Sequence, residues 1–91
     1  MFKKDQDENV KAMAFSSDGK FLAILTDFPN YTVYIWKWKK DKLLCSYEIG
    51  KRVEYISFNP LNRNQLCVSG NGNIFFLEII ESFKSQYIYC M

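Results

Sequence analysis

The side chains that most often carry acid–base or metal chemistry are sparse in this chain of 91 residues. It contains no histidine, which removes the commonest general base near neutral pH and the commonest metal ligand. The cysteines, Cys45, Cys67 and Cys90, lie far apart without a Cys-x-x-Cys pair, so they indicate neither a zinc site nor a disulfide framework. Their apolar flanks favour reduced, buried thiols. We therefore expect no catalytic residue, no metal and no cofactor.

The acidic and glycine-rich segments point to turns and ends rather than to sites. Asp18 precedes Gly19 within residues 16–20, a sequence typical of a tight turn between two strands. Residues 5–8 are acidic but lack the glycine and the ligand spacing of a calcium loop, so they are expected to belong to a flexible polar N-terminus. Residues 70–72 are too short and wrongly placed for a phosphate-binding loop. These observations argue against an enzyme.

Composition describes one small, folded, intracellular domain. Hydrophobic residues make up 48% of the chain and charged residues 24%, which is close to the globular average. The formal charge of +2 is too small to make nucleic acid or an anionic lipid surface the default partner. The N-terminus is charged where a signal peptide would be apolar, and no run approaches the roughly 18 apolar residues of a membrane span. We expect a cytoplasmic protein without membrane contact.

The elements that must position any site are strands. Short runs rich in β-branched and aromatic residues alternate with turn signals, and no long segment keeps a helical period. The predicted strands cover residues 10–15, 21–26, 31–38, 42–49, 53–58, 65–69 and 73–80. Residues 59–64 predict a longer turn, because Pro60 is followed by several asparagines. The pattern predicts an all-β fold.

The chain also repeats itself. Residues 10–16 align with residues 53–59 at an offset of 43, and the following strands align at offsets of 44 and 41. A four-stranded unit recurring every 40–45 residues or so has the period of a propeller blade. We predict a polar N-terminus at 1–9, a first blade at 10–50, and strands a to c of a second blade at 51–80. Residues 81–91 form a tail that could supply strand d.

The third predicted strand is apolar on both of its faces. Residues 32–38 are apolar or aromatic at odd and even positions, which favours burial on both sides. Trp36 and Trp38 are therefore expected to pack between blades. Radially stacked blades bury both faces of a sheet. A two-sheet β-sandwich unrelated to propellers remains an alternative architecture.

The first unit resembles the WD40 repeat family. Residues 10–23 are similar to strand a, the turn and strand b of that repeat, with Ser17 where proline is usual. Residues 32–37 are similar to strand c, but Lys37 stands where the Trp-Asp dipeptide has its aspartate, and the Gly-His pair is reduced to Gly50-Lys51. The resemblance implies about two four-stranded antiparallel blades, a fragment and not a closed propeller. It also implies that the family's Asp and His hydrogen-bond network is absent here.

A narrower resemblance concerns residues 58–60 and 65–72, which follow the aromatic segment 34–38. These residues look like the cilia- and flagella-associated WD-repeat proteins of the axoneme. That resemblance implies a non-catalytic scaffold in the cytoplasm, at the axoneme of a cilium or flagellum, with axonemal or microtubule-associated proteins as partners. Closed propellers have about four to eight blades. A two-blade chain therefore needs neighbouring blades of a parent chain or self-association to cover its apolar faces.

Two rims of the predicted blades carry candidate binding residues. The loop between strands b and c should lie beside the connection between the blades, which places an exposed Phe and Tyr next to a basic pair. The opposite rim is rich in lysine and could contact acidic or nucleic-acid surfaces, so a nucleic-acid or acidic-surface binding module is the alternative function. The candidates are Phe28, Asn30, Tyr31, Lys51 and Arg52 on the first rim, and Lys39 and Lys40 on the second.

Overall fold

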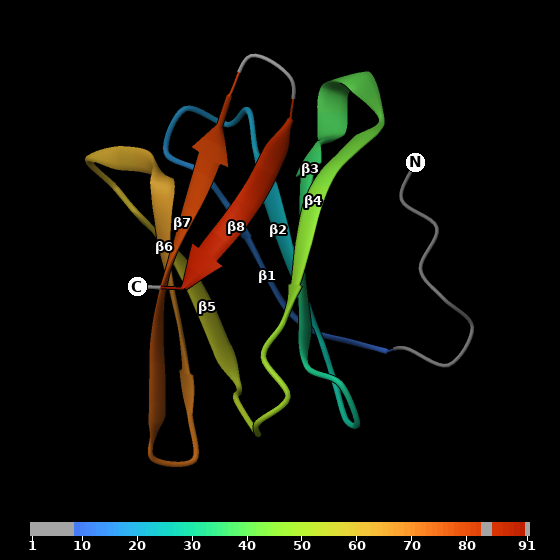
Figure 1. Cartoon of the computed structure of the whole chain (residues 1–91), viewed down its shortest axis with the longest axis vertical. Coiled ribbons are helices and arrows are strands. Elements are labelled where there is room, and N and C mark those ends of the chain that lie inside the picture. Colours follow the sequence, from blue (N-terminus) through green and yellow to red (C-terminus); the bar gives the residue numbers. More distant parts are fainter. Residues whose placement is uncertain (1–8, 83–84, 91) are drawn as a thin grey trace.

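The computed structural model describes residues 9–82 and 85–90. The polar segment 1–8, with its acidic run, and Met91 lie outside the described residues. Within the described part the chain folds into two four-stranded antiparallel sheets, so the all-β prediction is confirmed (Figure 1). The elements are β1 (Val10–Phe15), β2 (Leu22–Thr26), β3 (Thr32–Lys37), the 3₁₀ turn η1 (Trp38–Lys40), β4 (Lys42–Glu48), β5 (Tyr55–Asn59), β6 (Asn62–Gly70), β7 (Asn73–Glu81) and β8 (Gln86–Cys90).

Each strand pairs with the next strand along the chain. The first blade has the order β1-β2-β3-β4 and the second has the order β5-β6-β7-β8. Local turn chemistry explains the first hairpin, because the Asp18 carboxylate accepts hydrogen bonds from the Ser16 hydroxyl at 2.7 Å and the Lys20 amide at 3.0 Å. Gly19 adopts a φ of 73°, which a residue without a Cβ reaches easily. The predicted turn role of Asp18 is confirmed.

The tail contributes the eighth strand. β8 pairs with β7 so that Ile88 lies opposite Ile79, and both side chains are buried. Sequence comparison with the fourth strand of the first blade left this segment open, because the two segments align poorly. Burial of Ile88 against β7 determines how β8 pairs. Similarity between the two repeats does not determine it.

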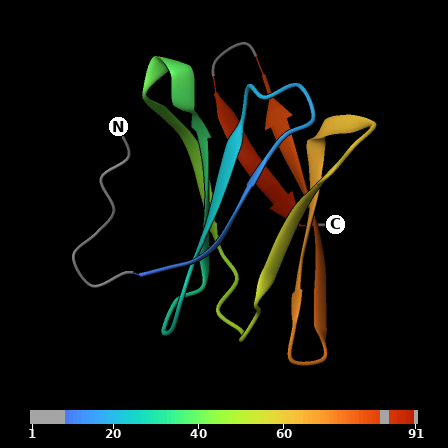
Figure 2. The same cartoon turned by 180° about the vertical axis from the view of Figure 1, so that it is seen from behind.

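One hydrophobic core joins the two blades. The sheets pack face to face, with β1 against β5 and β4 against β8, as Figure 2 shows from behind. Alternate residues of each strand point into the space between the sheets, which follows from the two-residue period of a strand. The buried cluster comprises Phe21, Ala23, Leu25, Tyr31, Val33 and Ile35 from the first blade and Val53, Ile56, Leu66, Val68, Leu77, Ile79 and Ile88 from the second.

The opposite faces of the two blades carry large apolar side chains that remain exposed. On the first blade these include Met13 and Phe15, which are 60% and 56% exposed. Met13 aligns with Ile56 at the repeat offset of 43, and Ile56 packs against the first blade. The first blade therefore exposes an apolar side chain at the position where the second blade buries one against its neighbour. A groove of about 280 Å³ runs along it, lined by Val10, Met13, Phe15, Leu22, Ile24, Trp36, Trp38 and Asp41. The outer face of the second blade exposes Tyr55, Ile74, Phe76, Tyr87 and Tyr89.

Two local predictions were wrong. β3 ends at Lys37, and Trp38 begins the 3₁₀ turn instead of extending the strand. Its indole Nε1 donates to the Gly19 carbonyl at 2.8 Å, and its ring meets the Phe15 ring edge-on at 5.6 Å. The charged residues 39–41 are exposed in this turn, and Asp41 closes it at a φ of 52°.

The connection between β5 and β6 is also shorter than predicted. Asn59 pairs with Asn62, which leaves Pro60 and Leu61 as the turn. The Asn59 side chain accepts a hydrogen bond from the Leu61 amide at 2.9 Å and donates one to Gln65 at 3.0 Å. These side-chain hydrogen bonds stabilise the short turn, in place of the backbone hydrogen bonds that a longer loop would need.

Candidate functional site

Two loops meet at the end of the molecule that we call the lower rim: the β2–β3 loop (27–31) and the β4–β5 connection (49–54). Two backbone hydrogen bonds join them: the Ile49 amide donates to Tyr31 and the Gly50 amide donates to Asn30, each at 3.0 Å. The structure thus brings together the two segments that the sequence placed on one rim.

The β2–β3 loop is fixed by its own hydrogen bonds. The Asp27 amide donates to the Asn9 carbonyl at 2.7 Å, and the Tyr31 amide donates to the Asp27 carbonyl at 3.2 Å. The Asp27 carboxylate accepts from the Phe28 amide at 2.7 Å. Tyr31 adopts a φ of 49°, in the left-handed region that is uncommon for an aromatic residue. This backbone turn lets the Tyr31 side chain join the shared core.

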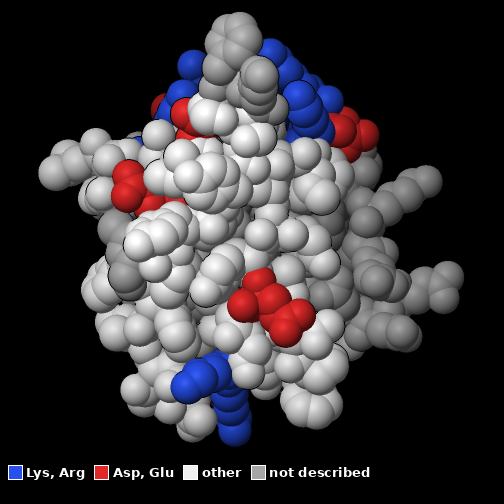
Figure 3. All heavy atoms as spheres, viewed as in Figure 1, with Lys and Arg blue, Asp and Glu red and all other residues white. Residues whose placement is uncertain are grey.

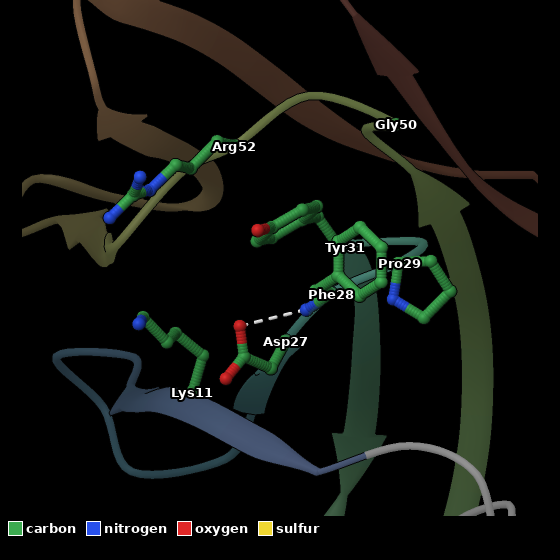
Figure 4. Close-up of a pocket in the computed structure, with 7 residues that line it drawn as sticks. All are labelled: Lys11, Asp27, Phe28, Pro29, Tyr31, Gly50 and Arg52. Carbon is green, nitrogen blue, oxygen red and sulfur yellow. Dashed lines mark hydrogen bonds between the residues drawn. The ribbon is translucent and has the colours of Figure 1, made fainter.

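The lower rim contains a pocket of about 460 Å³ (Figure 4). Phe28 is its exposed wall, at 74% of its possible accessibility, whereas Tyr31 is only 8% exposed and not the exposed side chain that the sequence suggested. Arg52 reaches the pocket from the β4–β5 connection and pairs with Glu54 at 3.6 Å. The lining residues are Lys11, Asp27, Phe28, Pro29, Tyr31, Gly50 and Arg52.

Sequence reasoning captured part of this lining. Phe28, Tyr31 and Arg52 were predicted on this rim and line the pocket. Asn30 and Lys51 lie on the same two loops but are not among its lining residues. Lys11 was missed, because nothing in a six-residue strand pattern shows that its side chain turns towards a distant loop.

The opposite end, which we call the upper rim, carries the second candidate set. Lys39 and Lys40 lie in η1, and both line a pocket of about 410 Å³ together with Asp18, Lys20, Lys37 and Arg63. Basic side chains gather at the top of the face shown in Figure 3, which is this rim. The Lys39 ammonium lies 5.6 Å from the centre of the Trp38 ring, a cation–π contact.

Arg63 joins the two blades at the upper rim. It extends from β6 to the Asp18 carboxylate of the first blade at 3.3 Å and to Glu81 of β7 at 3.8 Å. Its guanidinium also lies 5.0 Å from the ring of Phe21, which is fully buried. Arg63 therefore links a turn of the first blade to two strands of the second, a contact that the sequence did not indicate.

The hydrogen bonds around Asp18 predict an acid dependence of stability. They lower the pKa of its carboxyl below the ordinary value of 3.8, chiefly through the Ser16 hydroxyl, then the Lys20 amide and Arg63. A carboxyl with a lower pKa in the folded chain stabilises the fold above its unfolded pKa and loses that contribution as the pH falls. Thermal unfolding should therefore show a larger drop in midpoint between about pH 5 and about pH 3 for the natural chain than for Asp18→Asn. Parallel midpoint curves for the two chains would contradict this role of Asp18.

Cys45 is not an activated nucleophile. Burial, followed by the nearby charge of Glu81, raises the pKa of the Cys45 thiol to about 11, which disfavours the reactive thiolate. All three cysteines are free and half-buried, less deeply placed than the sequence suggested. Within residues 9–82 and 85–90, no group of three or more His, Cys, Asp or Glu side chains is placed to hold a metal ion. In the same residues, no helix has the length and apolarity to cross a membrane.

Comparison with a solved structure defines the class of fold. The β-propeller domain of Myceliophteria thermophila Cps50 (Swd1) superposes with a TM-score of 0.70 at 17% sequence identity, covering 91% of this chain and 24% of that one. This likeness confirms the propeller prediction and disfavours an unrelated sandwich. The chain is a two-blade segment of the β-propeller class, and the segment is not a closed propeller.

Comparison with curated protein sequences shows which proteins this chain is similar to. No family model matches the chain. Mouse cilia- and flagella-associated protein 44 is 37% identical over 70 residues, which is 76% of this chain and 4% of the relative. Mouse WD repeat-containing protein 90 is 36% identical over 72 residues, 78% of this chain and 4% of the relative. Cilia- and flagella-associated protein 43 of Chlamydomonas reinhardtii is 32% identical over 81 residues, 76% of this chain and 5% of the relative.

These relatives confirm the predicted resemblance. The chain is a WD-repeat segment, and among WD-repeat proteins it is similar to the cilia- and flagella-associated ones. It spans about a twentieth of the length of the curated relatives that it matches.

Proposed function

We propose that the chain is a non-catalytic scaffold that holds other proteins through the rims and faces of its two blades, in the cytoplasm at the ciliary or flagellar axoneme. The observation that carries this proposal is the pair of stacked blades with apolar outer faces, in a chain similar to cilia- and flagella-associated WD-repeat proteins. The relatives' names support the location, and axonemal or microtubule-associated proteins are the proposed partners.

The outer faces are proposed to contact further blades, either of a parent chain or of a second copy. Met13, Phe15 and Trp38 on one face and Tyr55, Ile74 and Phe76 on the other give each blade an exposed apolar surface. Burial of such surfaces is favourable, at roughly 25 cal/mol for each Å² of apolar area removed from water.

The lower rim is the proposed contact for other proteins. Phe28 supplies an exposed aromatic side chain and Arg52 an exposed guanidinium, the two residue types that most often dominate binding at protein interfaces. The buried Tyr31 side chain anchors the loop to the core, while Asn30 and Lys51 are proposed to flank the contact. Lys39 and Lys40 are proposed as a secondary contact for acidic protein surfaces.

The nucleic-acid alternative finds less support. The comparisons return WD-repeat and ciliary proteins. Two of the upper-rim cations already have acidic or aromatic neighbours, because Arg63 pairs with Asp18 and Lys39 lies over Trp38.

Retention at the axoneme tests the proposed function. The chain, tagged with a fluorescent protein and expressed in ciliated cells, should remain on axonemes after detergent extraction. Phe28→Ala should reduce the retained fraction, whereas Leu61→Ala, at an exposed turn of the upper rim, should leave it unchanged. Complete loss of the natural chain on extraction would contradict an axonemal role, and equal retention of both variants would remove Phe28 from the contact.

A further inference from the structure

We propose that the lower-rim pocket binds the carboxylate of an acidic residue in a partner protein, while an apolar neighbour of that residue packs on Phe28. This inference rests on the proposed function, since it takes the lower rim as a protein-binding surface. It adds the chemistry that the pocket would recognise and one residue, Lys11, that sequence reasoning did not identify.

A β-bulge directs Lys11 into the pocket. In the pairing of β1 with β2, Val10 lies opposite Thr26 and Ala12 lies opposite Leu25, so Lys11 is the extra residue of the bulge. Bulges redirect a side chain away from the regular alternation of a strand. The Lys11 ammonium and the Arg52 guanidinium lie on the same side of the pocket, although Lys11 belongs to β1 and Arg52 to the β4–β5 connection (Figure 4).

The charged side chains that line the pocket favour an anion. Among the lining residues that the structure describes, two are cationic, Lys11 and Arg52, and one is acidic, Asp27. One Asp27 oxygen already accepts the Phe28 amide, so its charge is partly compensated within the loop. Arg52 pairs with Glu54 at 3.6 Å, and a guanidinium with five N–H donors can still bind a second carboxylate.

The other end of the pocket is apolar. Phe28 and Pro29 form an exposed shelf beside the charged groups, as Figure 4 shows. A carboxylate alone would leave this shelf uncovered, whereas an acidic residue next to an aromatic or aliphatic one would contact both ends. An acidic peptide segment therefore fits better than a small inorganic anion.

The pocket is built before any ligand arrives. The backbone hydrogen bonds of Tyr31, Gly50 and Asp27 hold the two loops together and tie them to the start of β1. Tyr31 keeps an uncommon left-handed backbone, and such conformations concentrate at binding and catalytic sites because the surrounding structure must stabilise them. A preformed pocket loses less conformational entropy on binding.

Peptide binding to the full chain tests the proposal. The probe is a fluorescein-labelled peptide, Gly-Ser-Glu-Phe-Glu-Ser-Gly, and the control peptide has glutamine in place of both glutamates. Fluorescence anisotropy should give a Kd at least about fivefold weaker for the control peptide, and about fivefold weaker for the acidic peptide with Lys11→Gln or Arg52→Gln. Asp27→Asn keeps the oxygen that accepts the Phe28 amide but removes a repelling charge, so it should tighten binding about twofold.

Lys42→Gln is the matched control, because it removes one positive charge from an exposed residue that lies outside the pocket lining. It should change the Kd by less than about twofold. Equal binding of the two peptides, equal weakening by Lys42→Gln and Arg52→Gln, or no saturable binding up to about 1 mM would each overturn the proposal. Axonemal retention is measured separately, so a chain that is retained but does not bind the peptide loses this inference and keeps the proposed function.

Discussion

Replacing Leu77 by alanine should lower the free energy of unfolding by about 2–5 kcal/mol. Leu77 is fully buried at the centre of β7 and belongs to the core that both blades share. Truncation removes apolar contacts and leaves a cavity that the packed surroundings fill only in part. Leu61→Ala is the matched control, because the same chemical change at a side chain that is 93% exposed should cost less than about 0.5 kcal/mol.

The two tryptophans make this experiment informative about the whole fold. Trp36 and Trp38 both lie in the first blade, whereas Leu77 lies in the second. If the blades unfold as one unit, Leu77→Ala should shift the tryptophan fluorescence transition by as much as the far-ultraviolet circular dichroism transition. A fluorescence transition that stays in place while the circular dichroism transition moves would show that the blades unfold independently.

Gly70→Ala should destabilise the chain by about 3 kcal/mol or more, because both the backbone conformation and the space at this position exclude a side chain. Gly70 has a φ of 148°, and a Cβ atom there would lie 2.5 Å from the Glu54 amide nitrogen and 3.0 Å from the Val53 carbonyl carbon. The Glu54 amide donates to Ser69 at 2.8 Å, so the two backbones cannot separate without losing that hydrogen bond.

Gly72→Ala provides the comparison for this prediction. Gly72 also has a positive φ, of 79°, but a Cβ there would meet no atom within 4 Å. Only the conformational cost of about 1–2 kcal/mol should therefore apply. Denaturant unfolding should give a much lower free energy of unfolding for Gly70→Ala than for Gly72→Ala. Equal free energies of unfolding would contradict the close backbone approach at Gly70.

Most of the strands could be predicted from the sequence because their signals are local. Alternating apolar residues and turn residues such as Asp18 and Gly19 act over a few positions, and the repeat offset then relates one blade to the other. The sequence does not assign β8, because the pairing of this strand depends on the contact of Ile88 with Ile79 of β7. The predicted strand 31–38 extends one residue beyond the end of β3, because the aromatic side chain of Trp38 continues the strand pattern in the sequence although the backbone has already turned.

The candidate site was predictable only as far as topology determines it. The order of strands in a blade brings the β2–β3 loop next to the connection between blades, which placed Phe28 and Arg52 on one rim. The position of Lys11 depends on a bulge, and that of Arg63 depends on contacts between blades. Neither a bulge nor a contact between sheets leaves a pattern in a single sequence.

The solution mass of the chain at several concentrations tests the central claim most directly, that these are two blades whose outer faces require further blades. Light scattering on a sizing column followed by calorimetry should show species heavier than the 10.8 kDa chain and an unfolding midpoint that rises with concentration. Phe15→Glu, which places a charge on the outer face of the first blade, should shift the mass towards that of one chain. A monomer with one sharp transition that is independent of concentration would contradict the claim and indicate a self-contained β domain.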